Sequence, residues 1–408
     1  MTVRTLEPPA ALEPPVPEPS APERLSPLDA EHRALGAVFT GFNGWRMPVR
    51  YSSDLAEHRA VRQAAGLFDV SHMAVLEVSG TGAGALLDSA LSVRISALQA
   101  GRAKYALLLT EGGGILDDLI CYRLDAERHL LVANAGNREA VAACLRTLAE
   151  AAPGAIVADR SEDTAILALQ GPHAEQILRA TPGLLAGEPA SLGFYRAREG
   201  VFVSGGRRHP VLVARTGYTG EDGFELLLDV EAGVALWRAL LAAGTPLGLL
   251  PAGLAARDSL RLEAGMPLYG HELGLDVHPG RLPLAHALSL DEGRAFPGRA
   301  AVAAGPGHGA RLLVGLAGHG RRAARAGHAV LREAGGEQIG RVSSGTLSPS
   351  LGHPIAMAFV DPELARPGTP VTVDVRGSAE PFRVTVLPFY RRPARRRLGA
   401  LAPAGAGR

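Results

Sequence analysis

The sequence predicts an α+β protein with more than one domain. Its 408 residues exceed the usual size of a single hydrophobic core. Strand-like and helix-like segments alternate over residues 33–265 without a repeating βαβ unit, so a doubly wound parallel sheet is not expected. Beyond about residue 290, short apolar runs are separated by Gly and Pro, which indicates a small β-barrel or sandwich.

Composition restricts the classes of partner. The formal net charge is +1, so we expect no nucleic-acid partner, and no apolar run approaches the roughly 18 residues of a membrane-spanning helix. Cys121 and Cys144 form no C-x-x-C pair, which argues against a disulfide framework or a zinc site and fits a cytoplasmic location. Lys104 is the only lysine, which we attribute to biased genomic base composition.

Both ends of the chain are expected to be disordered tails. Residues 1–30 contain eight prolines, and their acidic residues and lack of an apolar stretch are unlike a transit or signal peptide. Residues 391–408 are basic and low in complexity.

The residue pattern in the first half of the chain predicts several short strands. Residues 33–51 read as two strands around Gly and Asn turns, and residues 52–70 begin with a helix that Ser52 or Ser53 can cap. After a strand at 72–80 and a helix, residues 104–136 contain three strands. A Gly-rich turn joins the first two of these strands, so we expect an antiparallel meander.

Helices become more frequent further along the chain. A helix at 138–152 precedes a strand at 164–171, and Pro172 begins another helix. Residues 209–229 predict two strands around a turn. The helices predicted at 233–244 and 253–265 both end at Gly.

Three carboxylates lie in segments that otherwise read as buried strands. Asp117 and Asp118 are adjacent in "GGGILDDLICYRL", and Glu225 lies in "FELLL". An unpaired buried carboxylate is costly or stays protonated, so these positions are candidates for function. For Glu225 an exposed position on an edge strand is an equally good interpretation.

Arg257 and Arg261 lie four residues apart, on one face of the helix predicted at 253–265. Like charges at this spacing repel each other by a few tenths of a kcal/mol. Either Asp258 and Glu263 neutralise them, or an anionic ligand is held there. We expect no metal site, because "HELGLDVH" lacks the H-E-x-x-H spacing.

Six stretches together resemble the aminomethyltransferases, the T-proteins of the glycine cleavage system. The resemblance spans about residues 35–387, and its motifs are "FDVSHM", "GGGILDDLI", "LQGP", "RTGYTGEDGFE", "GLAARDSLRLEAGMPLYG" and "SSGTLSPSLG". It implies a three-lobed, cloverleaf-like fold around tetrahydrofolate, with a C-terminal β-barrel. The implied reaction moves an aminomethyl unit from the lipoyl arm of H-protein to tetrahydrofolate, giving 5,10-methylenetetrahydrofolate and ammonia.

The resemblance also assigns roles to individual residues. The first aspartate of the pair matches the catalytic position, so Asp117 is expected beside the folate amines and Asp118 in a structural hydrogen bond. Strand alternation alone does not distinguish the two, because both faces are mixed. Glu225 matches the residue that binds the pterin, and Arg257 matches a folate contact. The remaining expected folate-binding residues are Tyr105, Asn134, Tyr218 and Met73.

Together with this resemblance, we expect the following boundaries for the three lobes. Residues 31–65 and 150–275 are expected to form a first α+β lobe, and residues 66–149 a second lobe with the Asp117 meander. Residues 280–390 are expected to form the barrel.

Two rival interpretations accompany the resemblance. One is a tetrahydrofolate-dependent demethylase or one-carbon transferase that acts on a small amine, ether or sulfonium donor. The other is a non-enzymatic factor for iron–sulfur protein maturation. Such factors resemble K-G-C-Y-x-G-Q-E where this chain reads "AGMPLYGHE", which favours an enzyme.

The segment at 271–286 departs from the family pattern. Gly274 replaces a common acid, and His286 lies where Trp often occurs. We expect this segment to affect how the one-carbon donor is received.

Overall fold

A seven-stranded sheet forms the first lobe of the computed structural model, which describes residues 23–393. Its strands, in spatial order, are β11 (Leu184–Leu185), β12 (Ala197–Ser204), β13 (Arg207–Ala214), β14 (Gly223–Asp229), β10 (Thr164–Gln170), β4 (Ala65–Asp69) and β15 (Leu249–Pro251). All neighbours pair antiparallel except β4 and β15. The central strands β4 and β10 are almost continuous apolar runs because both faces of the sheet are covered.

Helices cover one face of this sheet. Trp237 and Leu240 of α6 (Val230–Gly244) pack with Leu167 and Phe224 of the sheet, and α5 (Ala174–Ala180) joins the same core. Around it lie α1 (Asp29–Ala34), α2 (Asp54–Gln63), α7 (Leu254–Glu263) and a small sheet of β1 (Arg24–Leu25), β3 (Trp45–Arg50) and β2 (Val38–Phe42). Ser53 caps α2 by accepting a hydrogen bond from the backbone of Ala56, which decides between the two expected capping serines.

The second lobe contains the predicted meander. Its antiparallel sheet has the order β6 (Arg102–Leu109), β7 (Ile115–Arg123), β8 (Arg128–Ala133), β5 (Ala74–Ser79) and β9 (Ile156–Asp159). The strands β6, β7 and β8 are consecutive in the chain and adjacent in the sheet, so the meander is confirmed. Two helices, α3 (Ala83–Ala90) and α4 (Arg138–Ala149), cover its outer face through Leu86, Leu87, Val141 and Leu145.

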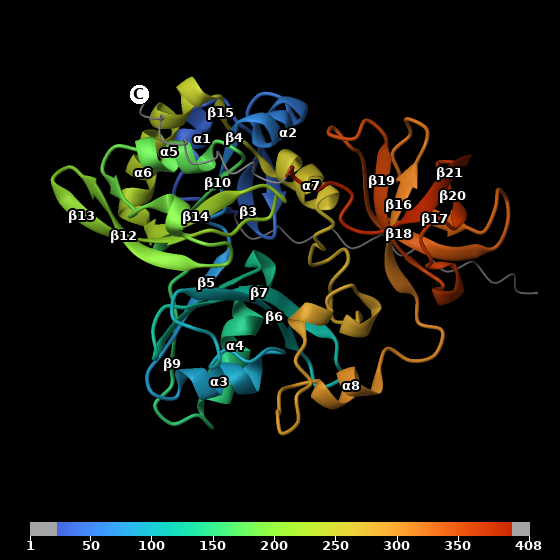
Figure 1. The fold of residues 1–408 in the computed structure, drawn as a ribbon, viewed down its shortest axis with the longest axis horizontal. Coiled ribbons are helices and arrows are strands. Elements are labelled where there is room, and N and C mark those ends of the chain that lie inside the picture. The colour runs from blue at the N-terminus through green and yellow to red at the C-terminus, as the bar shows by residue number, and fades with distance from the viewer. Residues whose placement is uncertain (1–22, 394–408) are drawn as a thin grey trace, which may run out of the picture.

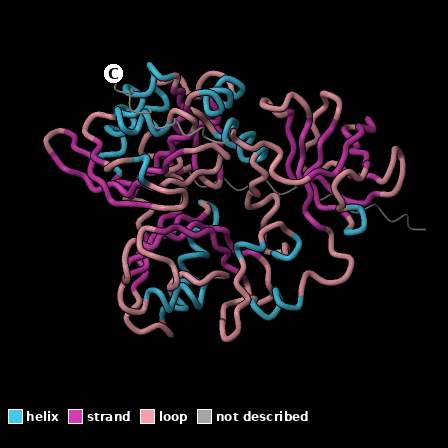
Figure 2. The backbone as a smooth tube through the Cα atoms, in the orientation of Figure 1, coloured by secondary structure: helices cyan, strands magenta, loops and turns pink. Residues whose placement is uncertain are grey.

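The third lobe is a closed six-stranded barrel. Its strands follow one another as β16 (Leu312–Gly318), β19 (Pro354–Val360), β18 (Gln338–Leu347), β17 (Ala329–Leu331), β20 (Pro370–Val375) and β21 (Ser378–Thr385). The short helix α8 (Arg299–Ala304) precedes it. Figure 1 shows the three lobes side by side, and Figure 2 shows that strands and loops dominate the barrel whereas helices flank the other two sheets.

The inner faces of the two sheets meet in a shared core. Phe68 and Leu227 of the first sheet pack in one cluster with Val75 and Tyr122 of the second sheet, and Leu260 brings α7 into it. The polar side chains on these inner faces are therefore held next to α7. Within residues 23–393, none of the helices combines the length and apolar character that crossing a bilayer requires.

The sheets divide the chain differently from the expected lobe boundaries. Strand β4 at 65–69 belongs to the first sheet because it pairs with β10, and β9 at 156–159 belongs to the second because it pairs with β5. Of the tail expected at 1–30, residues 1–22 lie outside the described residues, and residues 23–30 instead hold β1 and the start of α1. Of the tail expected at 391–408, residues 394–408 also lie outside them.

Candidate active site

A cavity of about 440 Å³ lies where the three lobes meet. Its walls come from both large sheets, from α7 and the loop after it, and from the barrel residue Leu313. All six residues predicted to bind folate line it: Met73, Tyr105, Asn134, Tyr218, Glu225 and Arg257. Asp117 does not line it, whereas its neighbour Asp118 does.

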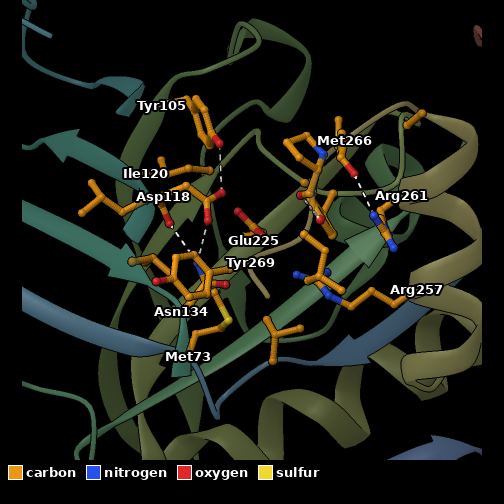
Figure 3. A pocket seen from close by; sticks show the side chains of 18 of the residues that line it. Met73, Tyr105, Asp118, Ile120, Asn134, Glu225, Arg257, Arg261, Met266 and Tyr269 are labelled. Carbon is orange, nitrogen blue, oxygen red and sulfur yellow. Dashed lines mark hydrogen bonds between the residues drawn. The ribbon is translucent and has the colours of Figure 1, made fainter. Parts of the chain in front are cut away.

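Asp118 presents its carboxylate to this cavity. The Tyr105 hydroxyl donates to Oδ2 at 3.0 Å, and the Asn134 amide donates to Oδ1 at 2.7 Å (Figure 3). Burial raises the pKa of Asp118 above its ordinary value. Such a carboxylate can exchange a proton closer to neutral pH than an exposed one.

Asp117 is fully buried among amide groups. It accepts hydrogen bonds from the backbone and side chain of Asn134, at 3.1 and 2.8 Å, and from the Asn137 amide at 2.7 Å. Burial and the adjacent Asp118 charge raise its pKa. Because successive residues of β7 point to opposite faces, only one aspartate can face the cavity. The structure places Asp118 there, and Asp117, the expected catalytic residue, outside the cavity wall.

Glu225 lies on β14 and offers one oxygen to the cavity. The Thr216 hydroxyl and the Tyr122 hydroxyl, the latter at 3.2 Å, both donate to Oε2. Within residues 23–393, no hydrogen bond to Oε1 is present. The carboxylate is therefore fixed at one oxygen and available to a ligand donor at the other.

Arg257 and Arg261 differ in how their charges are balanced. Arg261 pairs with Asp258 at 2.7 Å and with Glu272 at 3.0 Å, so it is neutralised inside the protein. Arg257 instead lies over the Tyr218 ring, 4.8 Å from its centroid, and forms no ion pair within the described part of the chain. Burial lowers the pKa of Arg257, and the Glu225 charge opposes this effect. Arg257 is thus available to a polar ligand group.

Several cavity residues were not predicted from the sequence. Tyr122, whose hydroxyl donates to Glu225, lies four residues after Asp118 on β7, so strand alternation from Asp118 identifies it. His72 in "FDVSHM" is 3% exposed, and burial lowers its pKa to about 4, so it is neutral at pH 7. No comparable sequence signal marks Tyr195, which reaches the cavity from the loop before β12.

Two family models together match nearly all of the described chain. The GCVT N-terminal domain matches residues 28–292, and the glycine cleavage T-protein C-terminal barrel domain matches residues 311–391. The aminomethyltransferase of Cutibacterium acnes is 50% identical over 379 residues, which cover 90% of this chain and 99% of that protein. The chain belongs to the glycine cleavage T-protein family.

Other T-proteins support the same assignment. The aminomethyltransferase of Streptomyces avermitilis is 49% identical, with 90% of this chain and 98% of that protein covered. The crystal structure of glycine cleavage system aminomethyltransferase T from Bartonella henselae matches with a TM-score of 0.81 and 38% identity, covering 90% and 98% of the two chains. The predicted family, the fold with its C-terminal barrel, and the aminomethyltransferase function are confirmed.

In the divergent segment at 271–286 of this T-protein, one of the two departures lines the cavity and the other does not. His286 lines the cavity, with its ring centroid 6.2 Å from that of Tyr105. Gly274 is absent from the cavity wall, and its carbonyl accepts a hydrogen bond from the Ile115 backbone at 3.0 Å. Of the two departures, His286 is therefore the one that can touch a ligand.

Proposed function

We propose that this T-protein moves the aminomethyl unit from the dihydrolipoyl arm of a lipoylated H-protein to tetrahydrofolate. The products are 5,10-methylenetetrahydrofolate, ammonia and the reduced lipoyl thiol. The observation that carries the proposal is one cavity that joins the Asp118 carboxylate, the Glu225 carboxylate and the Arg257 guanidinium, which has no ion pair among residues 23–393. We place the reaction in the cytoplasm, because Cys121 and Cys144 are free thiols, which fits a reducing compartment.

The cavity fits tetrahydrofolate by its chemistry. A pterin edge carries parallel N–H donors, and the open Oε1 of Glu225 beside its anchored Oε2 suits such an edge. Arg257 adds a cation beside the aromatic face of Tyr218. Met73 and Tyr269 provide further wall for a flat ring. Tetrahydrofolate supplies the amine nitrogens that accept the one-carbon unit.

We assign the proton-handling role to Asp118. Its carboxylate lies in the cavity wall and is oriented by Tyr105 and Asn134. Its raised pKa suits a group that orients a folate amine and takes or holds the proton that the amine loses. A positioned acid–base group of this kind contributes roughly 10² to 10⁴ in rate.

Asp117 does not line the cavity, so we assign it the role of a positioning residue. It fixes the backbone and side chain of Asn134, which in turn bonds Asp118. The Asn137 amide donates to Oδ1 of Asp117, the same oxygen that the Asn134 side chain contacts. The pair of aspartates is tolerated because both carboxylates are hydrogen-bonded: the Asn134 amide donates to each of them, Asn137 adds a bond to Asp117, and Tyr105 adds one to Asp118.

Reconstitution with purified components tests the proposal. The full-length protein is mixed with aminomethylated lipoyl H-protein and tetrahydrofolate, and methylenetetrahydrofolate and ammonia are quantified. We expect both products in equal amounts. Tight tetrahydrofolate binding without product from this donor would instead assign the chain a different one-carbon donor.

A further inference from the structure

His72 is a polar residue of the cavity wall to which the proposed function gives no role. It lies in the motif "FDVSHM" between β4 and β5, and its side chain is almost fully buried. Its Nδ1 is enclosed by the protein without a hydrogen-bond partner, and within residues 23–393 no hydrogen bond to Nε2 is present either. An unbonded polar group in the interior costs free energy that an apolar residue at the same place would not. An imidazole in this state is suited to a ligand that supplies the missing bond.

The turn that carries His72 is fixed by hydrogen bonds. The Ser71 N–H donates to Oδ1 of Asp69 at 2.9 Å, and the Met73 N–H donates to the carbonyl three residues earlier at 3.1 Å. Phe42 packs edge-on against the imidazole, with the ring centroids 5.4 Å apart. Backbone and ring are thus held beside the cavity before a ligand binds.

The charges near His72 determine which hydrogen-bonding group it offers. Burial lowers the pKa of His72 to about 4; the Asp69 charge opposes this effect and the Arg257 charge adds to it. The imidazole is therefore neutral at pH 7, with one nitrogen that donates and one that accepts. Since Nδ1 is enclosed, Nε2 is the nitrogen that a ligand can reach. Arg257 lines the same cavity, so its positive charge favours the tautomer in which Nε2 carries the lone pair.

The reduced pterin ring has one N–H donor that the proposed function leaves without a partner. Its amino group and N3–H suit Glu225, and N5–H belongs to the reacting side of the ring, with Asp118. The remaining ring donor is N8–H, which needs an acceptor. The ammonium group of an aminomethyl donor is a poorer ligand for His72, because the Arg257 charge would repel it.

We propose that His72 is a further folate-contacting residue, whose Nε2 accepts a hydrogen bond from N8–H of the reduced pterin. The inference rests on the proposed function, because it requires the pterin of tetrahydrofolate to bind Glu225 in the same cavity. It gives His72 a role in distinguishing reduced folates from folic acid, whose N8 has a lone pair in place of the hydrogen. Two acceptors that face each other form no bond, so folic acid gains no affinity from His72.

A series of folates separates the contributions of the ring hydrogens. Tetrahydrofolate has N5–H and N8–H, 7,8-dihydrofolate has only N8–H, and folic acid has neither. Calorimetry on the full-length protein measures their dissociation constants for the wild type, His72→Leu and His72→Gln. We expect His72→Leu to bind both reduced folates about three- to tenfold more weakly, because one hydrogen bond is lost. Its affinity for folic acid should change by less than about twofold, which also shows that the variant is folded.

His72→Gln keeps an acceptor near the position of Nε2 and should recover most of the lost affinity. His319→Leu is the matched control, since His319 is exposed and lies outside the cavity wall, and it should leave all of these affinities unchanged. Unchanged binding of both reduced folates by His72→Leu, or an equal loss for all the folates, would overturn the inference alone. A wild type that binds no folate would overturn the proposed function together with it.

Nitrogen NMR of the imidazole gives a second readout, which a purely structural role of His72 would not change. In protein labelled with nitrogen-15 histidine at pH 7, the His72 signals are identified by their absence from His72→Gln. We expect the Nε2 signal to move upfield when 7,8-dihydrofolate binds, because its lone pair then accepts a hydrogen bond. Folic acid should move it much less. Equal shifts with the two ligands would overturn the inference.

Discussion

At the scale of single residues, the site depends on two carboxylates that neighbouring side chains hold in place, and one oxygen of Glu225 stays open. Glu225 receives the Thr216 and Tyr122 hydroxyls on Oε2, and Asp118 receives Tyr105 on one oxygen and Asn134 on the other. These hydroxyl and amide donors fix the carboxylates before a ligand arrives. Preorganised groups of this kind need not be reordered when the ligand binds.

Removing the Glu225 carboxylate should weaken tetrahydrofolate binding more than neutralising it. Glu225→Ala deletes one partner of a desolvated charged hydrogen-bond pair, which typically costs about 2 to 5 kcal/mol. Glu225→Gln retains one acceptor and should lose less. Calorimetry with the wild type and both variants measures the difference. Equal affinity in all three proteins would mean that Glu225 does not contact the pterin.

The pH dependence of the free energy of unfolding should reveal the raised pKa of Asp117, the buried aspartate that Asn134 contacts. Burial and the Asp118 charge raise the pKa of Asp117 from 3.8 to about 7 in the folded protein. Between these two values the folded state binds more protons than the unfolded state, so the free energy of unfolding falls as pH rises. Asp117→Asn mimics the neutral acid and should show a shallower decline over this range.

Denaturant unfolding of both proteins at several pH values measures the two slopes. Asp118→Glu keeps an ionisable carboxyl group and so does not mimic a neutral acid. It serves as the comparison at the neighbouring position. An identical slope in the wild type and Asp117→Asn would show that Asp117 is ionised throughout.

At the scale of elements, α7 connects the active site to the barrel. Its Arg257 lines the cavity, while Arg261 donates to the Ser344 hydroxyl of β18 at 2.8 Å. Glu263, at the end of the helix, accepts hydrogen bonds from the barrel residues Ser348 and Ser350 and pairs with Arg62 at 2.8 Å. The sequence predicted this helix and its terminal Gly, but the partners of Glu263 are distant in sequence and could not be inferred from local pattern.

Glu263→Gln should destabilise the protein. Burial alone would raise the pKa of Glu263, but bonds from His58 and Ser348 and the Arg62 charge outweigh it and lower the pKa to about 2. A lowered carboxyl pKa stabilises the folded state above about pH 4.5, and this contribution is lost as pH falls toward 2. Neutralising the group should therefore lose about 1.5 to 3 kcal/mol at pH 7.

Urea unfolding at pH 7 and near pH 3 checks this expectation. The difference between the wild type and Glu263→Gln should shrink at the lower pH. A surface carboxylate such as Glu231, which is 71% exposed at its side chain, provides the matched control variant Glu231→Gln. A difference that stays constant with pH would contradict the role of the Glu263 charge.

At the scale of the whole molecule, three lobes surround one cavity, and this arrangement explains what the sequence could and could not predict. The meander and the barrel are encoded locally, by strand periodicity and turn residues, and both were predicted. The pairing of β4 with β10 and of β9 with β5 joins residues about 80 to 100 positions apart, and local patterns carry no signal for it. The same limit applies to Asp117 and Asp118, because the face that meets the cavity is decided by the packing of the two sheets.

In the proposed reaction, Asp118 handles the proton when the aminomethyl unit reaches tetrahydrofolate. The most direct measurement is single-turnover formation of methylenetetrahydrofolate from aminomethylated H-protein by the wild type, Asp118→Asn and Asp117→Asn. We expect Asp118→Asn to bind tetrahydrofolate but to react at least about 10²-fold more slowly, because the amide keeps the shape without the proton acceptor. Asp117→Asn should be slowed much less. A larger loss in Asp117→Asn than in Asp118→Asn would contradict the account.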